Sequence, residues 1–478
     1  MSGQALWTLD AMRAAMDADA RGPMPNTVAG LSIDSRTIAK GAAYFAIKGD
    51  VHDGHAFVEA AVANGAGVAV VERAQAGRFD GLPLLVVPDV LDGLRALARA
   101  ARSRLKGHVV AVTGSVGKTS TKEALRCVLA AQGETHASVA SFNNHWGVPL
   151  SLARCPAEAS YAIFEIGMNH AGEIEPLVRM VRPHVAVITN VEPVHLEFFG
   201  SLEAIADAKA EIFSGVEAGG AAVLNLDNSQ FARLRDAAHN AGVQRIVTFG
   251  AHASADARLL EVSLHAECSA VHASILGHDV TFKLGVPGRH MAVNSLAVLA
   301  AASLAHADLA RGALALSQMQ APAGRGVRVL LGVSGGSALL IDESYNANPA
   351  SMRAALSVLG KAPLGARGRR IAVLGDMLEL GPTGAELHAA LVDSVRENAV
   401  DLVFCCGALM RSLWEALPSN RRGGYADSSA ALESDVAAAI RAGDALMIKG
   451  SLGSKMKLIV EALQRRFPAP GALDDVAV

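Results

Sequence analysis

The chain of 478 residues is poor in cysteine and in aromatic residues, and neither sign of charge is in clear excess. Five cysteines, an odd number, do not form a disulfide framework, and no Cys-x-x-Cys pair is present to bind zinc. Lys and Arg number 43 against 46 Asp and Glu, a net charge of −3. This balance offers no large basic surface for a nucleic-acid backbone, so we expect no nucleic-acid partner.

Long hydrophobic runs are also missing. The longest uncharged apolar stretch, residues 291–307, is interrupted by Asn294, Ser295, Ser303 and His306. A membrane span needs about 20 mostly apolar residues, so we expect a buried helix there and no membrane span. The first residues carry no basic cluster and reach Asp10 before any apolar core develops, which is not typical of a secretory signal. We therefore expect a cytoplasmic protein.

Apolar residues and glycine are abundant. Hydrophobic residues make up 51% of the chain, charged residues 19% and aromatic residues 4%, and glycine occurs 46 times. This composition excludes disorder and favours Ala-rich helices packed on Val, Ile and Leu strands. At about 150 residues per domain, the length predicts roughly three domains. The predicted class is α/β, with a small mixed α/β N-terminal domain (1–106), a central P-loop ATPase-type parallel sheet domain (107–322) and a C-terminal Rossmann-like domain (323–478).

The order of apolar runs supports this division. In the first domain, strands are expected at 42–47, 68–71 and 84–87, before a helix at 90–106. In the second, the expected strands are 108–112, 161–166, 185–191, 221–225, 245–249, 271–275 and 280–284, followed by a helix at about 291–305. The turn-forming segment 322–326 is a predicted hinge. Beyond it, strands at 327–332, 338–341, 370–374, 402–405 and 445–448 alternate with helices around 352–359, 385–397 and 429–440, which is typical of a doubly wound sheet.

The strongest chemical signal is a glycine-rich loop between a strand and a helix. Residues 109–120 are V-V-A-V-T-G-S-V-G-K-T-S, although Val112 stands where the usual motif has its first glycine. Such a loop turns backbone N–H groups towards phosphate oxygens, Lys118 reaches the β- and γ-phosphates, and the Thr119 hydroxyl ligates Mg²⁺. We therefore predict that ATP or GTP binds at Gly114, Ser115, Val116, Gly117, Lys118, Thr119 and Ser120. The alternative is a glycine-rich turn with an incidental lysine.

Further polar residues follow the predicted strands. Glu165 ends an apolar strand, where open α/β sheets bind ligands, and it could ligate a metal there. His195 follows the next strand, and Lys209 lies in a helical segment. Taken singly, His195 is interpreted as an ordinary loop histidine and Lys209 as a solvated lysine on a helix. Their order along the chain makes them informative.

That order resembles the Mur ligases, the ATP-dependent amide-forming enzymes of peptidoglycan precursor synthesis. The shared motifs are 113–119, Glu165, His195, Lys209 and Gly288-x-His290 with Asn294. Later motifs resemble the family member that uses a D-Ala-D-Ala acceptor, and the resemblance covers nearly the whole chain. These are D-E-S-Y-N-A-N-P at 342–349, L-G-D-M-L-E-L-G at 374–381 and K-G-S at 449–451, with N-N-x-x-G-V-P at 143–149 and M-N-H-x-G-E-I at 168–174.

The resemblance implies a role for each matching residue. Thr119 and Glu165 would hold one Mg²⁺ on the ATP phosphates, while His195 and a carbamylated Lys209 would serve a second. The other implied nucleotide contacts are Asn294, Arg325, Asp342 and Asn346. Asn144 is implied to orient the transferred group, so the implied catalytic set is Lys118, Lys209, His195, Glu165 and Asn144. Ser35 and Arg36 are candidates for uridine-nucleotide binding, and Lys449 for the acceptor side.

The implied substrates are UDP-MurNAc-tripeptide and D-Ala-D-Ala, handled by a monomer whose C-terminal domain closes about 322–325. The third residue of the tripeptide is left open between meso-diaminopimelate and lysine. ATP would phosphorylate the tripeptide carboxylate, and the dipeptide amine would then attack the acyl phosphate. Three alternatives remain: another Mur or folylpolyglutamate-type ligase, a P-loop nucleotide switch protein, and a scaffold without turnover. A panel of amino acceptors separates the first alternative, and carboxylate-independent hydrolysis marks the second.

Overall fold

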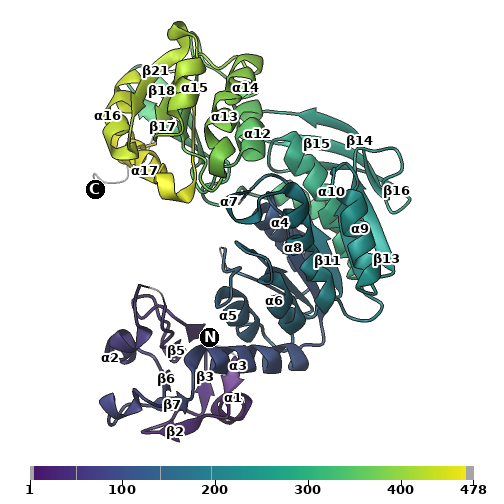
Figure 1. The fold of residues 1–478 in the computed structure, drawn as a ribbon, viewed down its shortest axis with the longest axis vertical. Coiled ribbons are helices and arrows are strands. Elements are labelled where there is room, and N and C mark those ends of the chain that lie inside the picture. The colour runs from purple at the N-terminus through teal and green to yellow at the C-terminus, as the bar shows by residue number, and fades with distance from the viewer. Residues whose placement is uncertain (1–4, 50, 140, 195, 470–478) are drawn as a thin grey trace, which may run out of the picture.

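The computed structural model describes residues 5–49, 51–139, 141–194 and 196–469. The chain folds into three lobes arranged in a crescent, with the N-terminal domain at one end, the C-terminal domain at the other and the central domain between them (Figure 1). Among the described residues, no helix is both long and apolar enough to span a bilayer. The five cysteines are free thiols.

The N-terminal domain is a small mixed α/β unit. Its five-stranded sheet has the order β2-β7-β6-β5-β4, parallel from β7 to β4, and β1 pairs with β3 beside it. Its strands are β1 (Trp7–Thr8), β2 (Asp19–Arg21), β3 (Thr27–Val28), β4 (Leu31–Ser32), β5 (Ala43–Phe45), β6 (Val68–Glu72) and β7 (Leu84–Val87), and its helices are α1 (Leu9–Met16), α2 (Val58–Ala63) and α3 (Val90–Arg104). The apolar runs of β6 and β7 form buried parallel strands because helices cover both faces. The prediction for 84–87 is confirmed in full.

The central domain contains a nine-stranded sheet in the order β16-β15-β14-β13-β12-β11-β8-β10-β9. Its strands are β8 (His108–Thr113), β9 (Thr135–Ala137), β10 (Tyr161–Glu165), β11 (Val185–Ile188), β12 (Ala221–Asn225), β13 (Arg245–Gly250), β14 (Ala257–Leu264), β15 (Ser269–Ile275) and β16 (His278–Leu284). The strands from β9 to β14 are parallel, and β15 and β16 add an antiparallel edge. The parallel part is the predicted P-loop-type sheet.

The described part of the central domain contains eight α-helices. They are α4 (Lys118–Ala130), α5 (Gly147–Ala153), α6 (Ile174–Val181), α7 (Leu196–Phe199), α8 (Leu202–Ala210), α9 (Phe231–Asn240), α10 (Arg289–Leu304) and α11 (Leu309–Ala315). The uncharged stretch at 291–307 is mostly α10, which packs against α4 and strands β12 to β15. Its sequence is apolar on all sides because neighbours cover most of its surface. The buried helix expected there is confirmed.

The C-terminal domain has a six-stranded sheet in the order β17-β18-β22-β19-β20-β21, in which β17 alone is antiparallel. Its strands are β17 (Val327–Val333), β18 (Gly336–Glu343), β19 (Arg370–Gly375), β20 (Leu402–Cys406), β21 (Arg422–Ala426) and β22 (Ala445–Lys449). Its helices are α12 (Pro349–Gly360), α13 (Gly384–Ala389), α14 (Leu391–Glu397), α15 (Arg411–Ala416), α16 (Ser429–Ala439) and α17 (Lys457–Arg466). The single helix predicted at 385–397 is two helices, α13 and α14, that meet at Ala390.

The two junctions between domains are built differently. One continuous apolar core joins the N-terminal domain to the central domain, and it includes Trp7, Leu97 and Leu150. Helix α3 lies against α5 and α6 of the central domain. The C-terminal domain instead has two cores of its own, one on each face of its sheet.

Candidate active site

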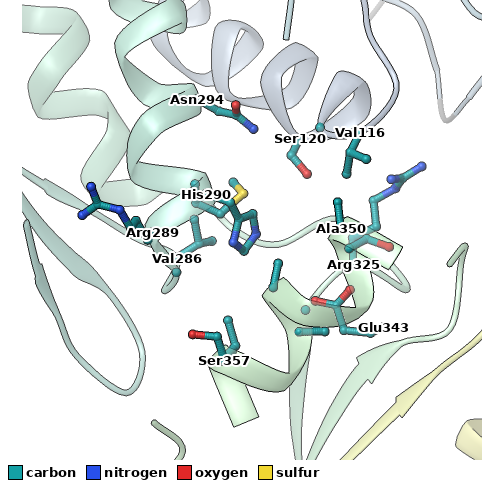
Figure 2. Close-up of a pocket in the computed structure, with 18 of the residues that line it drawn as sticks. Val116, Ser120, Val286, Arg289, His290, Asn294, Arg325, Glu343, Ala350 and Ser357 are labelled. Atoms are coloured by element: carbon teal, nitrogen blue, oxygen red, sulfur yellow. The ribbon is translucent and has the colours of Figure 1, made fainter. Parts of the chain in front are cut away.

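A cavity of about 580 Å³ lies between the central and C-terminal domains. The phosphate loop, the start of α4 and the start of α10 line it from the central domain. The linker 321–326, the end of β18, helix α12 and Lys449 line it from the C-terminal domain. Figure 2 shows His290 and Asn294 on one helix, with His290 on the side of Ala350 and Glu343 and Asn294 on the side of Ser120. Most of the predicted nucleotide residues, from both domains, thus border one space, with Asp342 and Gly114 outside its lining.

The phosphate loop connects β8 to α4 through two glycines with positive φ. Gly114 has φ of 144°, and a Cβ there would lie 1.9 Å from Thr189 Oγ1. Gly117 has φ of 87°, and a Cβ there would lie 2.7 Å from Asn294 Nδ2. A side chain at either position would therefore collide with a neighbour as well as strain the backbone. The second contact also places Asn294 against the loop, on the nucleotide side as predicted.

The N-terminus of α4 faces this cavity. Helix α4 begins at Lys118, and its first turn has no preceding helical residues to accept its N–H groups. Among the described residues, no acceptor is recorded for the N–H groups of Gly117, Lys118, Thr119 and Ser120. These four donors and the positive end of the helix dipole form an anion site of the kind that binds phosphate.

Lys118 lies across its own loop. Its Nζ donates to the carbonyl of Gly114 at 2.6 Å and to that of Ser115 at 3.4 Å. Burial lowers the pKa of Lys118, the charge of Glu165 opposes this, and the charge of Arg325 adds to it. An incoming polyphosphate would offer Lys118 a stronger partner than two carbonyls, because charge-assisted hydrogen bonds are about twice as strong as neutral ones.

Two buried oxygens near the loop have no partner. Thr119 Oγ1 and Glu165 Oε2 make no hydrogen bond with any described residue, although Thr119 is 5% and Glu165 1% exposed. The other carboxylate oxygen, Glu165 Oε1, accepts from Asn143 Nδ2 at 2.7 Å. Unpaired hard oxygens in the first turn of α4 and at the end of β10 fit a divalent cation on the phosphates. Within the described residues, this site included, no cluster of three His, Cys, Asp or Glu side chains is arranged to hold a metal.

Lys209 is buried near the end of α8, with only 2% of its surface exposed. Within the described residues its ammonium forms no recorded hydrogen bond or ion pair. Burial lowers the pKa of Lys209 well below its usual range, and the positive charge of Lys118 adds to this effect. The interpretation of Lys209 as a solvated helix lysine is therefore wrong, and burial shifts its equilibrium towards the neutral amine.

Asn144 and His195 complete the predicted catalytic set. Asn144 Oδ1 accepts from the N–H of Gly147 at 2.9 Å, at the start of α5. Its neighbour Asn143, for which no role was predicted, is the amide that contacts Glu165. The two adjacent asparagines in the sequence indicated that an amide lies at the site. Which of them faces the Glu165 carboxylate depends on how the loop turns, and the sequence does not show this. His195 lies outside the described residues.

The C-terminal wall carries the remaining charges. The Arg325 guanidinium stacks on Tyr345, 4.2 Å from the ring centroid, and Figure 2 shows it extending towards Val116 of the phosphate loop. Lys449 is buried, and its Nζ donates to Glu343 Oε2 at 3.3 Å and to the Asn346 carbonyl at 2.9 Å. Burial lowers the pKa of Lys449, and the carboxylate of Glu343 opposes this. Glu343, which the sequence did not single out, thus holds the predicted lysine.

Asp342 and the pair Ser35–Arg36 lie away from the cavity lining. Asp342 Oδ1 accepts from the N–H and hydroxyl of Ser344, at 3.0 and 2.6 Å, so it shapes the turn after β18. Ser35 and Arg36 follow β4 in the N-terminal domain. There the exposed Arg36 forms a two-bond pair with Asp34, at 3.0 and 2.8 Å. This pair lowers the pKa of Asp34 to about 2.

Comparison with known families covers most of the chain. A model of the Mur ligase middle domain matches residues 112–302. A model of the Mur ligase family catalytic domain matches residues 27–103, and one of the Mur ligase glutamate ligase domain matches residues 330–452.

Individual relatives are similar over nearly their full length. The UDP-N-acetylmuramoyl-tripeptide–D-alanyl-D-alanine ligase of Escherichia coli is 34% identical over 440 residues, covering 92% of this chain and 94% of its own. A crystal structure of MurF from Acinetobacter baumannii superimposes with a TM-score of 0.82 at 29% identity, covering 96% and 99% of the two chains. MurF ligase from Thermotoga maritima, solved in complex with ADP, has a TM-score of 0.74 at 26% identity, covering 91% and 98%.

Proposed function

Because the chain belongs to the Mur ligase family, we propose that it joins D-alanyl-D-alanine to UDP-N-acetylmuramoyl-tripeptide with ATP, in peptidoglycan precursor synthesis. The observation that carries this proposal is the cavity between two domains, with a phosphate loop on one wall and Arg325, Asn346 and Lys449 on the other. Such a site can bind a nucleotide and bring a second reactant to its terminal phosphate. The relatives named for this reaction support the choice of substrates.

The reaction must first activate a poor electrophile. A peptide carboxylate resists attack by an amine, so its oxygen takes the γ-phosphoryl group of ATP while the bond to the β-phosphate oxygen breaks. The dipeptide amine then attacks the acyl carbon and loses a proton, and inorganic phosphate leaves with the carbon–oxygen electron pair. The products are the pentapeptide, ADP and phosphate.

The central domain supplies the groups that stabilise the transferred phosphoryl. The four N–H groups at the start of α4 can hold the phosphate oxygens, and Lys118 can follow the charge as it moves from ATP to the carboxylate. Arg325 can approach the same phosphates from the C-terminal side. Fixed donors of this kind act in the transition state without reorganising.

Magnesium fits the unpaired oxygens beside the loop. Thr119 Oγ1 and Glu165 Oε2 would hold one ion, and Asn143 keeps the Glu165 carboxylate oriented. A second ion is proposed at His195 and Lys209. When bound, these ions would neutralise charge on the phosphates.

Lys209 is suited to carry a carbamate. Burial favours the neutral form of this amine, which is the form that is nucleophilic towards CO₂, and the carbamate exchanges a cation for oxygen ligands that suit Mg²⁺. Electron density beyond Nζ in a crystal grown with bicarbonate tests this assignment. A bare amine there would count against it.

The outer domains take the two other substrates in this proposal. The N-terminal domain binds the uridine nucleotide near Ser35 and Arg36, and the C-terminal domain carries the dipeptide. Closure about the linker 322–326 brings Lys449 over the nucleotide. We further propose that the protein acts as a cytoplasmic monomer, which size-exclusion chromatography with light scattering tests for the oligomeric state.

ADP release is the decisive measurement. The full chain is assayed with ATP, Mg²⁺, UDP-MurNAc-tripeptide and D-Ala-D-Ala, and each peptide substrate is omitted in turn. ADP and pentapeptide should form together only when both are present. Tripeptides ending in meso-diaminopimelate and in lysine are compared in parallel. ADP release without either peptide would favour a nucleotide switch, and turnover with a different acceptor would indicate another ligase.

A further inference from the structure

The segment that follows β11 is hydrogen-bonded along the phosphate loop. Thr189 Oγ1 donates to the Val116 carbonyl at 2.6 Å, while the N–H of Val116 donates to Asn190 Oδ1 at 3.0 Å. The N–H of Ser115 donates to the Asn190 carbonyl at 2.9 Å. Ser115 Oγ donates to the Glu192 carbonyl at 3.0 Å and lies 2.9 Å from the N–H of Glu192. We call these contacts between residues 115–116 and 189–192 the loop bracket.

The bracket is buried and closely fitted. Thr189 is 1% exposed, and its N–H donates to the Thr113 carbonyl at 3.0 Å, so its backbone continues the sheet. Its hydroxyl occupies the space where a Cβ on Gly114 would lie, at 1.9 Å. Behind it, Asn225 Nδ2 lies 3.4 Å from the Thr189 carbonyl. Thr189, Asn190 and Asn225 also line the cavity between the domains.

The bracket determines which loop amides can reach a ligand. The N–H groups of Ser115 and Val116 already have protein acceptors, both supplied by Asn190. The N–H groups of residues 117–120, on the first turn of α4, are left for the phosphates. A loop in which two of its amides were released would sample other orientations, and ordering it on binding would cost affinity.

We propose that Thr189 and Asn190 are positioning residues for the nucleotide. They bind the carbonyl and the N–H of Val116, so that the loop keeps the shape in which Lys118 and the start of α4 face the polyphosphate. They need not touch the nucleotide themselves. This inference rests on the nucleotide site of the proposed function and adds residues to which no role had been assigned there.

A matched pair of substitutions at Thr189 tests the hydroxyl. Thr189→Val keeps the shape and removes the donor, whereas Thr189→Ser keeps the donor and removes a methyl group. The affinity for ADP is measured by calorimetry on the full chain without peptide substrates. Thr189→Val should bind ADP about tenfold more weakly, the scale of one buried hydrogen bond, and Thr189→Ser should stay within about twofold of the parent. Equal losses in both variants, or none in Thr189→Val, would overturn the proposal.

A second pair separates positioning from a general loss of packing. Asn190→Ala removes the acceptor for Val116 and should also weaken ADP binding about tenfold. Asn228 is the control, because its Nδ2 donates to the Val191 carbonyl at 2.9 Å on the same segment without contacting the loop. Asn228→Ala should bind ADP like the parent, even if its melting temperature falls. Similar ADP affinities for the two alanine variants would contradict the proposal.

The readout is independent of the ligase reaction. If the parent binds ADP but makes no pentapeptide, the proposed function fails while the positioning of the loop is still tested. If the parent makes pentapeptide and Thr189→Val binds ADP as tightly as the parent does, the inference fails alone.

Discussion

The two junctions between domains differ in what fills them. Between the N-terminal and central domains there is continuous apolar packing, in which Trp7 Nε1 donates to the Ala153 carbonyl at 2.9 Å. Between the central and C-terminal domains there is a cavity of about 580 Å³ and a turn-rich linker. Packed cores resist deformation, whereas a junction that contains a cavity can change shape at lower cost. We therefore expect the first two domains to behave as one body, against which the third can move.

The positively charged side chains at the two junctions also differ in whether they connect the domains. Arg102 Nε donates to the Val181 carbonyl at 2.7 Å, and Arg154 Nε to the Leu31 carbonyl at 2.8 Å, so both cross the first junction. At the second junction, Arg325 stacks on Tyr345 and Lys449 pairs with Glu343, each inside the C-terminal domain. A backbone hydrogen bond from Glu197 to Glu379 does cross it, at 3.3 Å. At the first junction, positively charged side chains hold the two domains together. At the second junction, different positively charged side chains stay within one domain and line the cavity, where a ligand can contact them.

Removing the Lys118 side chain should give the largest effect of these substitutions, a loss of activity without a loss of stability. Lys118→Ala removes the mobile cation of the phosphate site, so kcat should fall by about a thousandfold or more, the scale of losing a preorganised charge in the transition state. Its melting temperature should stay near that of the parent, because the side chain contacts only loop carbonyls. ADP release and thermal unfolding are measured together, with the exposed Lys106→Ala as control. Near-normal turnover in Lys118→Ala would contradict the assignment of the nucleotide site to the cavity at the second junction.

Removing Trp7 should have the opposite profile. Trp7 is 4% exposed, and the Arg104 guanidinium lies 3.5 Å from its ring centroid. Trp7→Ala should lower the free energy of unfolding by about 3–5 kcal/mol, the range for a large aromatic lost from a core. Urea unfolding measures this, while kcat of the folded fraction should change little. Trp7→Phe keeps a ring and should lose less. A small effect from the alanine variant would show that the first junction is not a true core.

Acid should weaken the region next to the first junction. Burial lowers the pKa of His136 to about 4, and its Nε2 lies 2.7 Å from the carbonyl of Ser151 on α5. Since the unfolded pKa is near 6.5, the unfolded chain takes up the proton first as pH falls below that value. His136 should therefore cost about 2 kcal/mol of stability by pH 5, relative to pH 7. Urea unfolding at both pH values measures this loss, and His136→Gln should flatten the slope. An unchanged slope in that variant would place the acid sensitivity elsewhere.

Stiffening the linker should give the smallest effect. Gly324 has φ of +70°, and a Cβ there would lie 3.0 Å from Tyr345 Cβ, so Gly324→Ala strains the hinge segment by about 1 kcal/mol. We expect kcat to fall about fivefold if closure uses this segment. Gly335→Ala is the control, with φ of +83° in the β17–β18 turn and nothing near the added Cβ. It should lose similar stability and keep kcat. Equal kcat values in the two variants would move the hinge away from Gly324.

The fold was predictable wherever strands were continuously apolar. The runs at 84–87 and 221–225 were placed to the residue, because buried parallel strands carry their own signal. Strand β14 was missed because its polar residues, among them Arg258 and Glu261, interrupt any apolar pattern, and its pairing with β13 and β15 holds it. The strand predicted at 185–191 ends at Ile188. The Thr189 N–H still pairs with Thr113, but the side chains of Thr189 and Asn190 are hydrogen-bonded to the phosphate loop.

The candidate site was predictable as a set of motifs but not as a set of contacts. The glycine spacing around Lys118 identified the loop because glycine is required where Thr189 and Asn294 approach. The bracket residues Thr189 and Asn190 had no sequence signal of their own, since they ended an apolar run. The continuous core across the first junction was equally hidden. A sequence motif indicates which ligand a domain binds. The packing between domains depends instead on apolar surfaces that no motif describes.

The fused first junction has a consequence for substrate length. Under the proposed function, a peptide linked to a uridine nucleotide in the N-terminal domain would have to reach the phosphate loop across a body whose two parts share one core. Such a core would keep the distance between the two sites nearly constant, and each residue extends a peptide by at most about 3.5 Å. We therefore expect peptide length itself to contribute to the choice of substrate, and tripeptide, dipeptide and tetrapeptide substrates compared for turnover would measure that contribution.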